Sequence, residues 1–274
     1  MPVESDMVLP QLDGWALILG ASSGFGAAAS LHFARAGMNV VGVHLDRRAT
    51  LEKAQQIASE IQSLGRQAWF YNVNAADPAK RAHVLTDVQR RFSERGRGER
   101  VRVLLHSLAF GSLRPFTDSK PEERIVASQL DMTLDVMANS LVYWTQSLLE
   151  ADLFADNSRI FAMTSTGSGT SWGGYGAVSA AKAALESHIR QLSLELSPRG
   201  ITANAICAGV TDTPALRKIP EYQSMIEAAL QRNPSGRLTQ PSDVASALVA
   251  LALPSTYWMT GNVICVDGGE SHSG

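Results

Sequence analysis

A glycine-rich loop near the start of the chain has the residue types needed to bind a phosphate group. Gly20, Gly24 and Gly26 are separated by Ala21-Ser22-Ser23 and by Phe25, and alanines opening a helical stretch follow. Glycines let the backbone turn tightly and approach a pyrophosphate, whose charge is met by amide groups at the helix N-terminus. Because the loop directly follows an apolar, strand-like segment, it predicts dinucleotide binding and not merely a tight turn.

A tyrosine and a lysine in the second half of the chain form a second candidate site. Tyr175 precedes Lys182 by seven residues, and Gly173, Gly174 and Gly176 surround the tyrosine. A lysine ammonium favours the ionised form of a nearby tyrosine, whose reference pKa is about 10. Seven residues of helix span about two turns, or about 10 Å. We therefore expect Tyr175 where the helix begins, from where its hydroxyl can reach a substrate.

The elements that must position these residues follow from the hydrophobic pattern. Short β-rich apolar runs alternate with helical stretches, as in repeated β-α units around a parallel sheet. The predicted strands are residues 15–19, 39–43, 67–72, 101–105, 159–163, 202–206 and 262–266. The predicted helices are residues 25–36, 51–64, 79–92, 122–149, 178–196 and 242–251. Right-handed crossovers then give an α/β fold of the Rossmann type, a three-layer sandwich with a seven-stranded, mostly parallel sheet.

The chain shows no internal division. No repeat or low-complexity linker interrupts its 274 residues, a length that a single doubly wound α/β domain commonly fills. We expect one dinucleotide-binding catalytic domain over residues 1–274, with an N-terminal tail over residues 1–13.

An irregular segment, residues 211–236, follows the last but one predicted strand. It begins at the carboxyl edge of the sheet, where open α/β sheets bind ligands. Prolines surround a short helical stretch within it, and we expect a mobile substrate lid. Some of its apolar side chains fit an acyl chain and a core equally well: Ala215, Leu216, Ile219 and Met225.

Composition and charge exclude several classes of function. The chain carries 24 Lys and Arg against 26 Asp and Glu, a net charge of −2. This balance disfavours binding to nucleic acid or to anionic membranes. No run approaches the roughly 18 apolar residues of a membrane span, and the first residues lack the features of a secretory signal. We expect neither a nucleic-acid nor a membrane partner.

Three further groups of residues have ordinary interpretations. Six arginines lie between residues 90 and 102, and we expect a solvated loop there because charge runs usually face water. Cys207 and Cys265 lie among apolar residues, which is typical of buried thiols in a reducing compartment, so we expect a cytoplasmic protein. Four histidines show no ligand spacing, and no metal site is expected from them: His32, His83, His188 and His272.

Several motifs together resemble the short-chain dehydrogenase/reductase family, and the resemblance covers nearly the whole chain. They are the spacing of the glycine loop, Asn72-Val73 where the family usually has Asp-Val under the adenine, Ala208-Gly209 at the family's Pro-Gly, and Val266-Asp267-Gly268-Gly269. The resemblance implies that Lys182 holds the nicotinamide ribose and that Thr213 contacts the cofactor's amide or phosphate. The implied cofactor-binding residues are Gly20, Ser22, Ser23, Gly24, Phe25, Gly26, His44, Arg47, Arg48, Asn72, Val73, Ser107, Leu108, Ala109, Lys182, Gly209, Val210 and Thr213.

The end of the second predicted strand bears on the choice of cofactor. Enzymes that prefer NAD place an acid there, on the adenosine ribose, and the family's spacing puts His44 at that position. Arg47 and Arg48 follow closely, and guanidinium groups match the geometry of a 2′-phosphate. We therefore expect NADPH. NADH stays an alternative, because Asp46 would accept the ribose hydroxyl if the turn brings it inward.

The spacing of the tyrosine departs from the ordinary family. Ordinary members carry Tyr-x3-Lys, but Val178 stands four residues before Lys182, so the pattern here is Tyr-x6-Lys from Tyr175. This spacing resembles the divergent enoyl-thioester reductases, which include the enoyl-[acyl-carrier-protein] reductases. The segment His106-Ser107-Leu108-Ala109-Phe110 is similar to their His-Ser-Ile-Gly-Phe, and Asn204-Ala205-Ile206-Cys207-Ala208-Gly209 is similar to their Asn-Ala-Ile-Ser-Ala-Gly.

Other features are closer to the ordinary family. The glycine loop is of the ordinary kind, and Ser165 lies at the position of the ordinary catalytic serine. Met137 takes the place of the supporting asparagine, and Asn139 falls two residues away. The combination resembles the NADPH-linked enoyl reductases that stay near the ordinary family.

The resemblance implies NAD(P)H-dependent reduction of the C2–C3 double bond of a 2-enoyl thioester, on acyl-carrier protein or coenzyme A. Tyr175 would stabilise the developing enolate, while Ser165 either binds the carbonyl, orients Tyr175 or serves only as a turn residue. The alternatives are an NADPH-dependent ketoreductase and a non-catalytic, cofactor-binding regulatory protein. Family members usually pair their long helices into tetramers, which implies a homotetramer.

Overall fold

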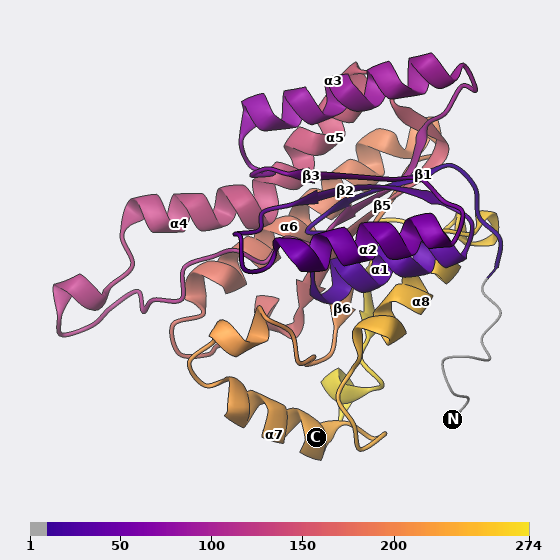
Figure 1. Cartoon of the computed structure of the whole chain (residues 1–274). Helices are drawn as coiled ribbons and strands as arrows, with labels where there is room; N and C mark the ends of the chain where they lie inside the picture. The colour runs from indigo at the N-terminus through magenta and orange to yellow at the C-terminus, as the bar shows by residue number, and fades with distance from the viewer. Residues whose placement is uncertain (1–9, 274) are drawn as a thin grey trace.

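The computed structural model describes residues 10–273 and contains one parallel sheet (Figure 1). Its strand order is β3-β2-β1-β4-β5-β6-β7, and every neighbouring pair is parallel. The order reverses between β1 and β4, which places a ligand crevice at the carboxyl ends of these strands. The bounds are β1 (Trp15–Leu19), β2 (Asn39–His44), β3 (Ala68–Asn72), β4 (Val101–His106), β5 (Phe154–Ser165), β6 (Thr202–Ala208) and β7 (Val263–Val266). The predicted Rossmann-type fold and its seven strands are confirmed.

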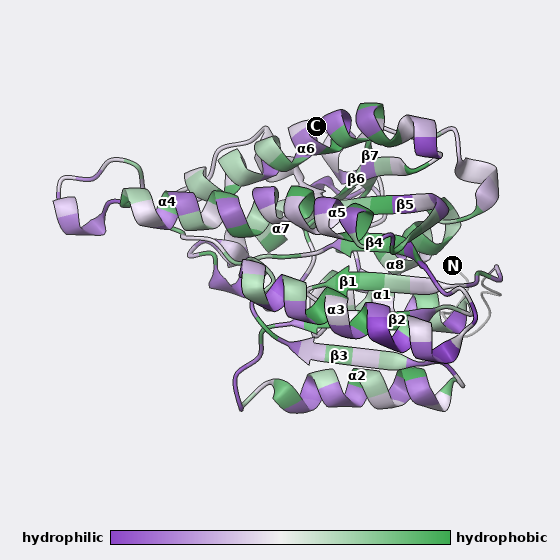
Figure 2. Ribbon diagram, turned by 90° about the horizontal axis from the view of Figure 1, so that it is seen from above, coloured by the Kyte–Doolittle hydropathy of each residue, from purple (hydrophilic) through white to green (hydrophobic). Residues whose placement is uncertain are grey.

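Helices cover both faces of the sheet and complete the three layers (Figure 1). One face packs against α1 (Gly24–Arg35), α2 (Leu51–Ser63) and α8 (Pro241–Leu251). The other packs against α3 (Pro78–Arg95), α5 (Ser140–Glu150) and α6 (Gly176–Leu196). β1 is buried along its whole length and forms a continuous apolar run, and β1, β4 and β5 are largely coloured as hydrophobic in Figure 2.

Local sequence explains where α3 begins and ends. The Asp77 carboxylate accepts hydrogen bonds from the backbone N–H groups of Ala79 and Lys80, and Pro78 occupies the first turn, where no backbone donor is needed. The helix ends at Gly96, whose φ of 63° is a left-handed conformation that favours glycine.

The helix predicted over residues 122–149 starts later than expected, at Ala127, and it contains an unpredicted π-helical turn. The structure has α4 (Ala127–Leu134), a π-helical turn (Asp135–Asn139) and then α5. At this junction the Ser140 hydroxyl donates to the Val136 carbonyl, and the buried ring of His106 lies 2.8 Å from the same hydroxyl. Hydrophobic periodicity alone does not predict a π-helical turn that depends on a polar contact with β4. α4 itself extends away from the body of the molecule (Figure 1).

The two segments predicted outside the regular elements contain defined contacts or helical turns among the described residues. Residues 1–9 of the expected tail lie outside the described residues, but Leu12 is buried and its N–H donates to the Ala36 carbonyl. The expected lid contains a 3-10 turn (Leu216–Lys218) and α7 (Tyr222–Arg232). Its mobility stays a prediction.

The arginine-rich segment is a loop only in part, because residues 90–95 belong to α3 and residues 101–102 to β4, and most of its arginines form ion pairs. Asp87 pairs with Arg90 and Arg91, and Glu94 also pairs with Arg90. Three more carboxylates, Glu99, Asp152 and Asp13, each pair with one further arginine of the segment. Exposed pairs of this kind contribute little to stability.

One expectation about the cysteines is wrong. Cys207 is buried, but Cys265, its register partner on the next strand, is exposed because β7 is the edge strand of the sheet. No helix among residues 10–273 is long and apolar enough to cross a bilayer.

Trp144 connects α5 to the loop after β3 and gives a test of the core. Its ring is fully buried, and its Nε1–H donates to the Ala75 carbonyl at 2.8 Å. Trp144→Phe leaves that carbonyl unpaired and a small void, so we expect the free energy of unfolding to fall by about 2 kcal/mol. Trp258→Phe is the matched control, because Trp258 is 86% exposed. Equal unfolding energies for both variants, measured in urea, would contradict this role.

Candidate active site

A cavity opens at the carboxyl edge of the sheet and brings many of the predicted site residues together. It is bounded by the loops after β1, β4, β5 and β6, by the start of α6, and by the lid. The predicted residues that line it are Ser23, Gly24, Phe25, Ser107, Leu108, Ala109, Ser165, Tyr175, Lys182, Gly209, Val210 and Thr213. Gly20, Ser22, Gly26, His44, Arg47, Arg48, Asn72 and Val73 lie outside this lining, at the far end of the glycine loop and around the ends of β2 and β3.

The glycine loop has a shape that only glycine permits. Gly20 has a φ of +92°, and a Cβ there would lie 2.3 Å from the Ser107 carbonyl oxygen. A Cβ on Gly26 would lie 2.1 Å from the Gly20 carbonyl oxygen. These close approaches bring the first turn of α1 to the crevice, where its unbonded amide groups can meet a pyrophosphate.

The residues expected to select the cofactor differ in exposure, since His44 and Asp46 point inward and the two arginines after them are exposed. The His44 ring is buried, and its Nδ1 lies 2.8 Å from the Asp46 carboxylate. Burial alone would raise the pKa of Asp46, but side-chain hydrogen bonds with Thr50, Ser22 and His44 outweigh it and lower the pKa. Asp46 is thus turned inward, toward the glycine loop, while the next two residues, both arginines, are exposed.

Asn72 holds the backbone of this turn. Its side-chain oxygen accepts the Asp46 N–H at 2.9 Å, and its side-chain nitrogen donates to the Asp46 carbonyl at 3.0 Å. The backbone N–H of Val73 donates to the His44 carbonyl at 2.8 Å. Asn72 therefore fixes the position of Asp46, a role that its motif position did not predict.

Tyr175 lies immediately before α6, as expected from its spacing to Lys182. Its hydroxyl lies 3.5 Å from the Ser165 hydroxyl at the end of β5. The ring packs against Gly167, where a Cβ would lie 2.6 Å from the Tyr175 ring. Gly167 was missed from the sequence, since its requirement comes from a residue that is not its neighbour in the chain.

Burial controls the protonation of the tyrosine. Burial raises the pKa of Tyr175, and the hydrogen bond with Ser165, not the charge of Lys182, opposes this rise. The expected promotion of the ionised tyrosine by Lys182 is not among the causes that set its pKa in this arrangement. Tyr175 stays a neutral hydrogen-bond donor at neutral pH.

Lys182 is a buried cation on the same helix. Its Nζ donates to the Met163 carbonyl at 2.6 Å. Burial lowers the pKa of Lys182 to about 8, and the charge of Glu186 opposes this fall. The ammonium also contributes to a low pKa of the neighbouring His106, after burial as the main cause, and His106 is neutral.

Apolar side chains fill the places that polar groups hold in the ordinary family. Val178 and Met137 both line the cavity, at the positions of the ordinary tyrosine and of the supporting asparagine. Asn139 faces elsewhere, with its Oδ1 3.1 Å from His188 Nε2. Four apolar residues of the lid also line the cavity, although the sequence did not distinguish a core role from a substrate-binding role for them: Ala215, Leu216, Ile219 and Met225.

These features fit a nicotinamide dinucleotide. The close-packed glycine loop and first turn of α1 suit its pyrophosphate, and the buried ammonium of Lys182 suits ribose hydroxyls. Among residues 10–273, no group of three or more His, Cys, Asp or Glu side chains is placed to hold a metal ion.

Comparison with known families decides the assignment. A family model described as Enoyl-(Acyl carrier protein) reductase matches residues 20–271. The chain belongs to the short-chain dehydrogenase/reductase family. The matching model and the relatives are described as reductases or dehydrogenases, and this chain is assigned to the oxidoreductases.

Relatives of this short-chain dehydrogenase/reductase carry different names. It is 27% identical to 3-oxoacyl-[acyl-carrier-protein] reductase FabG of Thermotoga maritima, over 92% of this chain and 96% of that protein. It is 26% identical to 1-cyclohexenylcarbonyl-CoA reductase of Streptomyces collinus, over 93% of this chain and 86% of that protein. The structure is similar to a dehydrogenase/reductase from Sinorhizobium meliloti, with a TM-score of 0.80, 26% identity and coverage of 95% and 96%.

The buried lysine predicts how dinucleotide affinity depends on pH. Below a pKa of about 8 Lys182 carries the charge that would hold ribose hydroxyls, and above it the charge is lost. We expect affinity for the reduced dinucleotide to fall as the pH rises from 7 to about 9, measured by the fluorescence of the bound nucleotide. Lys182→Met should bind more weakly at pH 7 and show no such fall. Constant affinity of the unaltered protein across this range would refute the role.

Proposed function

We propose that this short-chain dehydrogenase/reductase uses NADPH to reduce the C2–C3 double bond of a 2-enoyl thioester. The observation that carries the proposal is the position of the acid. Tyr175 lies in the cavity before the first turn of α6, seven residues ahead of Lys182, and Val178 fills the place four residues ahead.

The substrate's geometry explains why the acid stands there. In a ketone, the atom that needs a proton is bonded to the carbon that receives hydride. In a 2-enoyl thioester, the developing enolate oxygen is three bonds from that carbon, so the acid must stand elsewhere. When bound, the reduced nicotinamide would supply hydride to C3 of the enoyl group, and a proton from solvent taken up at C2 of the resulting enolate would complete the saturated thioester.

The chain's own residues handle the charge that develops. Because burial raises the pKa of Tyr175, its hydroxyl remains protonated and donates a hydrogen bond to the thioester oxygen. Ser165, 3.5 Å from that hydroxyl, orients it. Lys182 holds the nicotinamide ribose, and the apolar lid and Met137 exclude water around an acyl chain.

A ketoreductase is the second candidate, and one contact favours it. The Ser165 and Tyr175 hydroxyls lie 3.5 Å apart, an arrangement in which the serine binds a substrate carbonyl and the tyrosine protonates it. The FabG relative is also named for a 3-oxoacyl substrate. The name of the Streptomyces relative describes reduction of a 1-cyclohexenylcarbonyl thioester, which is a 2-enoyl thioester. We favour the enoyl substrate because of the altered tyrosine position.

A spectrophotometric assay separates the candidates. Oxidation of NADPH with crotonyl-CoA or longer 2-enoyl thioesters is the expected result, and activity only on 3-oxo thioesters would identify a ketoreductase. Tyr175→Phe should lower kcat about 100-fold, because it removes a donor to the developing oxyanion, while leaving the Kd for NADPH nearly unchanged. Unchanged turnover in this variant would remove Tyr175 from the mechanism. Dinucleotide binding without turnover of either substrate would indicate a regulatory protein.

The cofactor preference is proposed from the groups beyond β2. The Asp46 carboxylate has turned inward, as NADH binding would require, but it already interacts with Thr50, Ser22 and His44. Arg47 and Arg48 are exposed, and they are the groups suited to a 2′-phosphate. These observations support NADPH over NADH.

Substitution of the two arginines tests this preference. We expect Arg47→Ala and Arg48→Ala each to lower kcat/KM for NADPH about tenfold, because each removes a charge-assisted hydrogen bond, and to leave kcat/KM for NADH unchanged. Arg66→Ala is the control, since Arg66 lies beyond the opposite end of α2. A strong preference of the unaltered protein for NADH would contradict the proposal.

The proposed assembly and substrate carrier rest on the family resemblance. We propose a homotetramer acting in the cytoplasm on thioesters of acyl-carrier protein or coenzyme A. Trp144 and Leu148 on α5 are fully buried in the core of the chain itself.

A further inference from the structure

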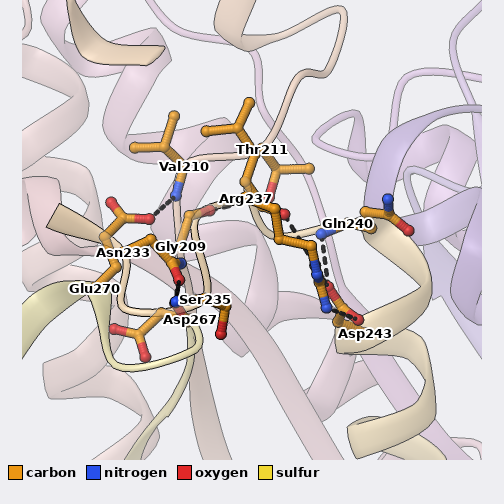
Figure 3. A network of polar contacts seen from close by, with 11 residues as sticks. Gly209, Val210, Thr211, Asn233, Ser235, Arg237, Gln240, Asp243, Asp267 and Glu270 are labelled. Atoms are coloured by element: carbon orange, nitrogen blue, oxygen red, sulfur yellow. Dashed lines mark hydrogen bonds and ion pairs between the residues drawn. The ribbon is translucent and has the colours of Figure 1, made fainter. Parts of the chain in front are cut away.

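A polar network beneath the cavity contains a buried carboxylate that the proposed mechanism does not use. Glu270, in the turn after β7, is only 4% exposed. Figure 3 shows it beside Val210, and its Oε2 accepts the Val210 backbone N–H at 3.1 Å. Its Oε1 lies 3.8 Å from the guanidinium of Arg232, the last residue of α7 in the lid.

This contact fixes one side of the cavity wall. The peptide between Gly209 and Val210 is held at both ends, since its N–H donates to Glu270 and its carbonyl accepts the Thr211 hydroxyl at 2.9 Å. Gly209 leaves no room for a side chain, because a Cβ would lie 2.8 Å from Glu270 Oε2 and 2.4 Å from Thr239 Oγ1. The wall formed by Gly209, Val210 and Thr211 therefore has one backbone orientation.

The turn that carries Glu270 is itself well supported. The Asp267 carboxylate accepts the N–H groups of Gly269 and Ser271, each at 3.0 Å. Its carbonyl accepts the Asn233 side chain at 2.9 Å, which joins the end of the lid to the same turn (Figure 3). These hydrogen bonds fix the backbone of the turn from which the Glu270 side chain extends.

Stability alone does not account for this carboxylate. Burial has the largest effect on the pKa of Glu270 and raises it. The N–H of Val210 and the charge of Arg232 lower this pKa, the charge of Asp267 raises it, and the net effect is a rise. Its charged form is therefore costly to bury, and an apolar side chain of similar size would fill the same space at lower cost. What an apolar residue would lack is the acceptor for Val210.

We propose that Glu270 is a positioning residue, which orients the segment from Gly209 to Thr213 against the nicotinamide half of the bound cofactor. The inference rests on the proposed function in one respect, because it takes this segment as the wall that meets the nicotinamide. It concerns binding only, and it holds for an enoyl reductase and for a ketoreductase alike.

Two substitutions of Glu270 separate its reach from its charge. Glu270→Gln keeps the length and an acceptor oxygen, so we expect a Kd for the reduced dinucleotide within about threefold of the unaltered protein. Glu270→Asp keeps the charge but is one methylene too short, and the unpaired Val210 N–H should weaken the Kd about tenfold. Isothermal calorimetry measures both, with thermal unfolding to show that each variant is folded.

A fragment of the cofactor distinguishes positioning from a general loss of structure. The adenosine half, adenosine 2′,5′-bisphosphate for NADPH or ADP for NADH, should bind to Glu270→Asp as it does to the unaltered protein. Arg237→Met is the matched control, since it breaks the 2.7 Å ion pair with Asp243 in the same network (Figure 3) without touching Val210. This control should bind the whole dinucleotide normally.

The outcomes are distinct. Dinucleotide binding by Glu270→Asp equal to the unaltered protein, an equal loss in Glu270→Gln, or a parallel loss of fragment binding would each overturn the positioning role. Failure of the unaltered protein to bind either reduced dinucleotide would overturn the proposed function as well, and the two failures are therefore separable.

Discussion

The arrangement of the site depends on the close approach of backbone segments where the order of the sheet reverses. At the crevice between β1 and β4, Gly20 passes so near the Ser107 carbonyl, and Gly26 so near Gly20, that neither position has room for a Cβ atom. A side chain at either position would push α1 away from the strands. The helix N-terminus would then no longer meet the cavity that Tyr175 and Lys182 line from the other side.

Burial gives this cavity its electrostatic character. It raises the pKa of Tyr175 and lowers the pKa of Lys182, so in both groups it favours the neutral form. For the tyrosine, this preserves a hydrogen-bond donor at neutral pH. For the lysine, it leaves a cation that loses its proton at a pKa of about 8. One physical cause thus supplies both a neutral acid and a titratable cation within one apolar enclosure.

Most of the fold was predictable because the signals are local. The strand predicted over residues 15–19 matches β1, and the spacing to Lys182 placed Tyr175 where α6 begins. The helix predicted over residues 122–149 is right from Ala127 onward, but its π-helical turn was not predicted. That turn lies next to Ser140, whose hydroxyl contacts the buried ring of His106 on another element. The exposure of Cys265 was missed for a similar reason, because the sequence does not say which strand lies at the edge of the sheet.

The sequence by itself determined the repeated β-α units, the phosphate-binding loop and the altered tyrosine spacing, because periodicity and motif spacing are properties of neighbouring residues. The tertiary structure decided which side chains meet. Asp46 turns toward the glycine loop where Asn72, on the next strand, binds its backbone N–H and carbonyl, and His44 is buried at the end of β2. Likewise, Glu270 reaches Val210 across 60 residues of chain. Contacts between distant segments depend on how the sheet and its loops pack, so only the folded chain shows them.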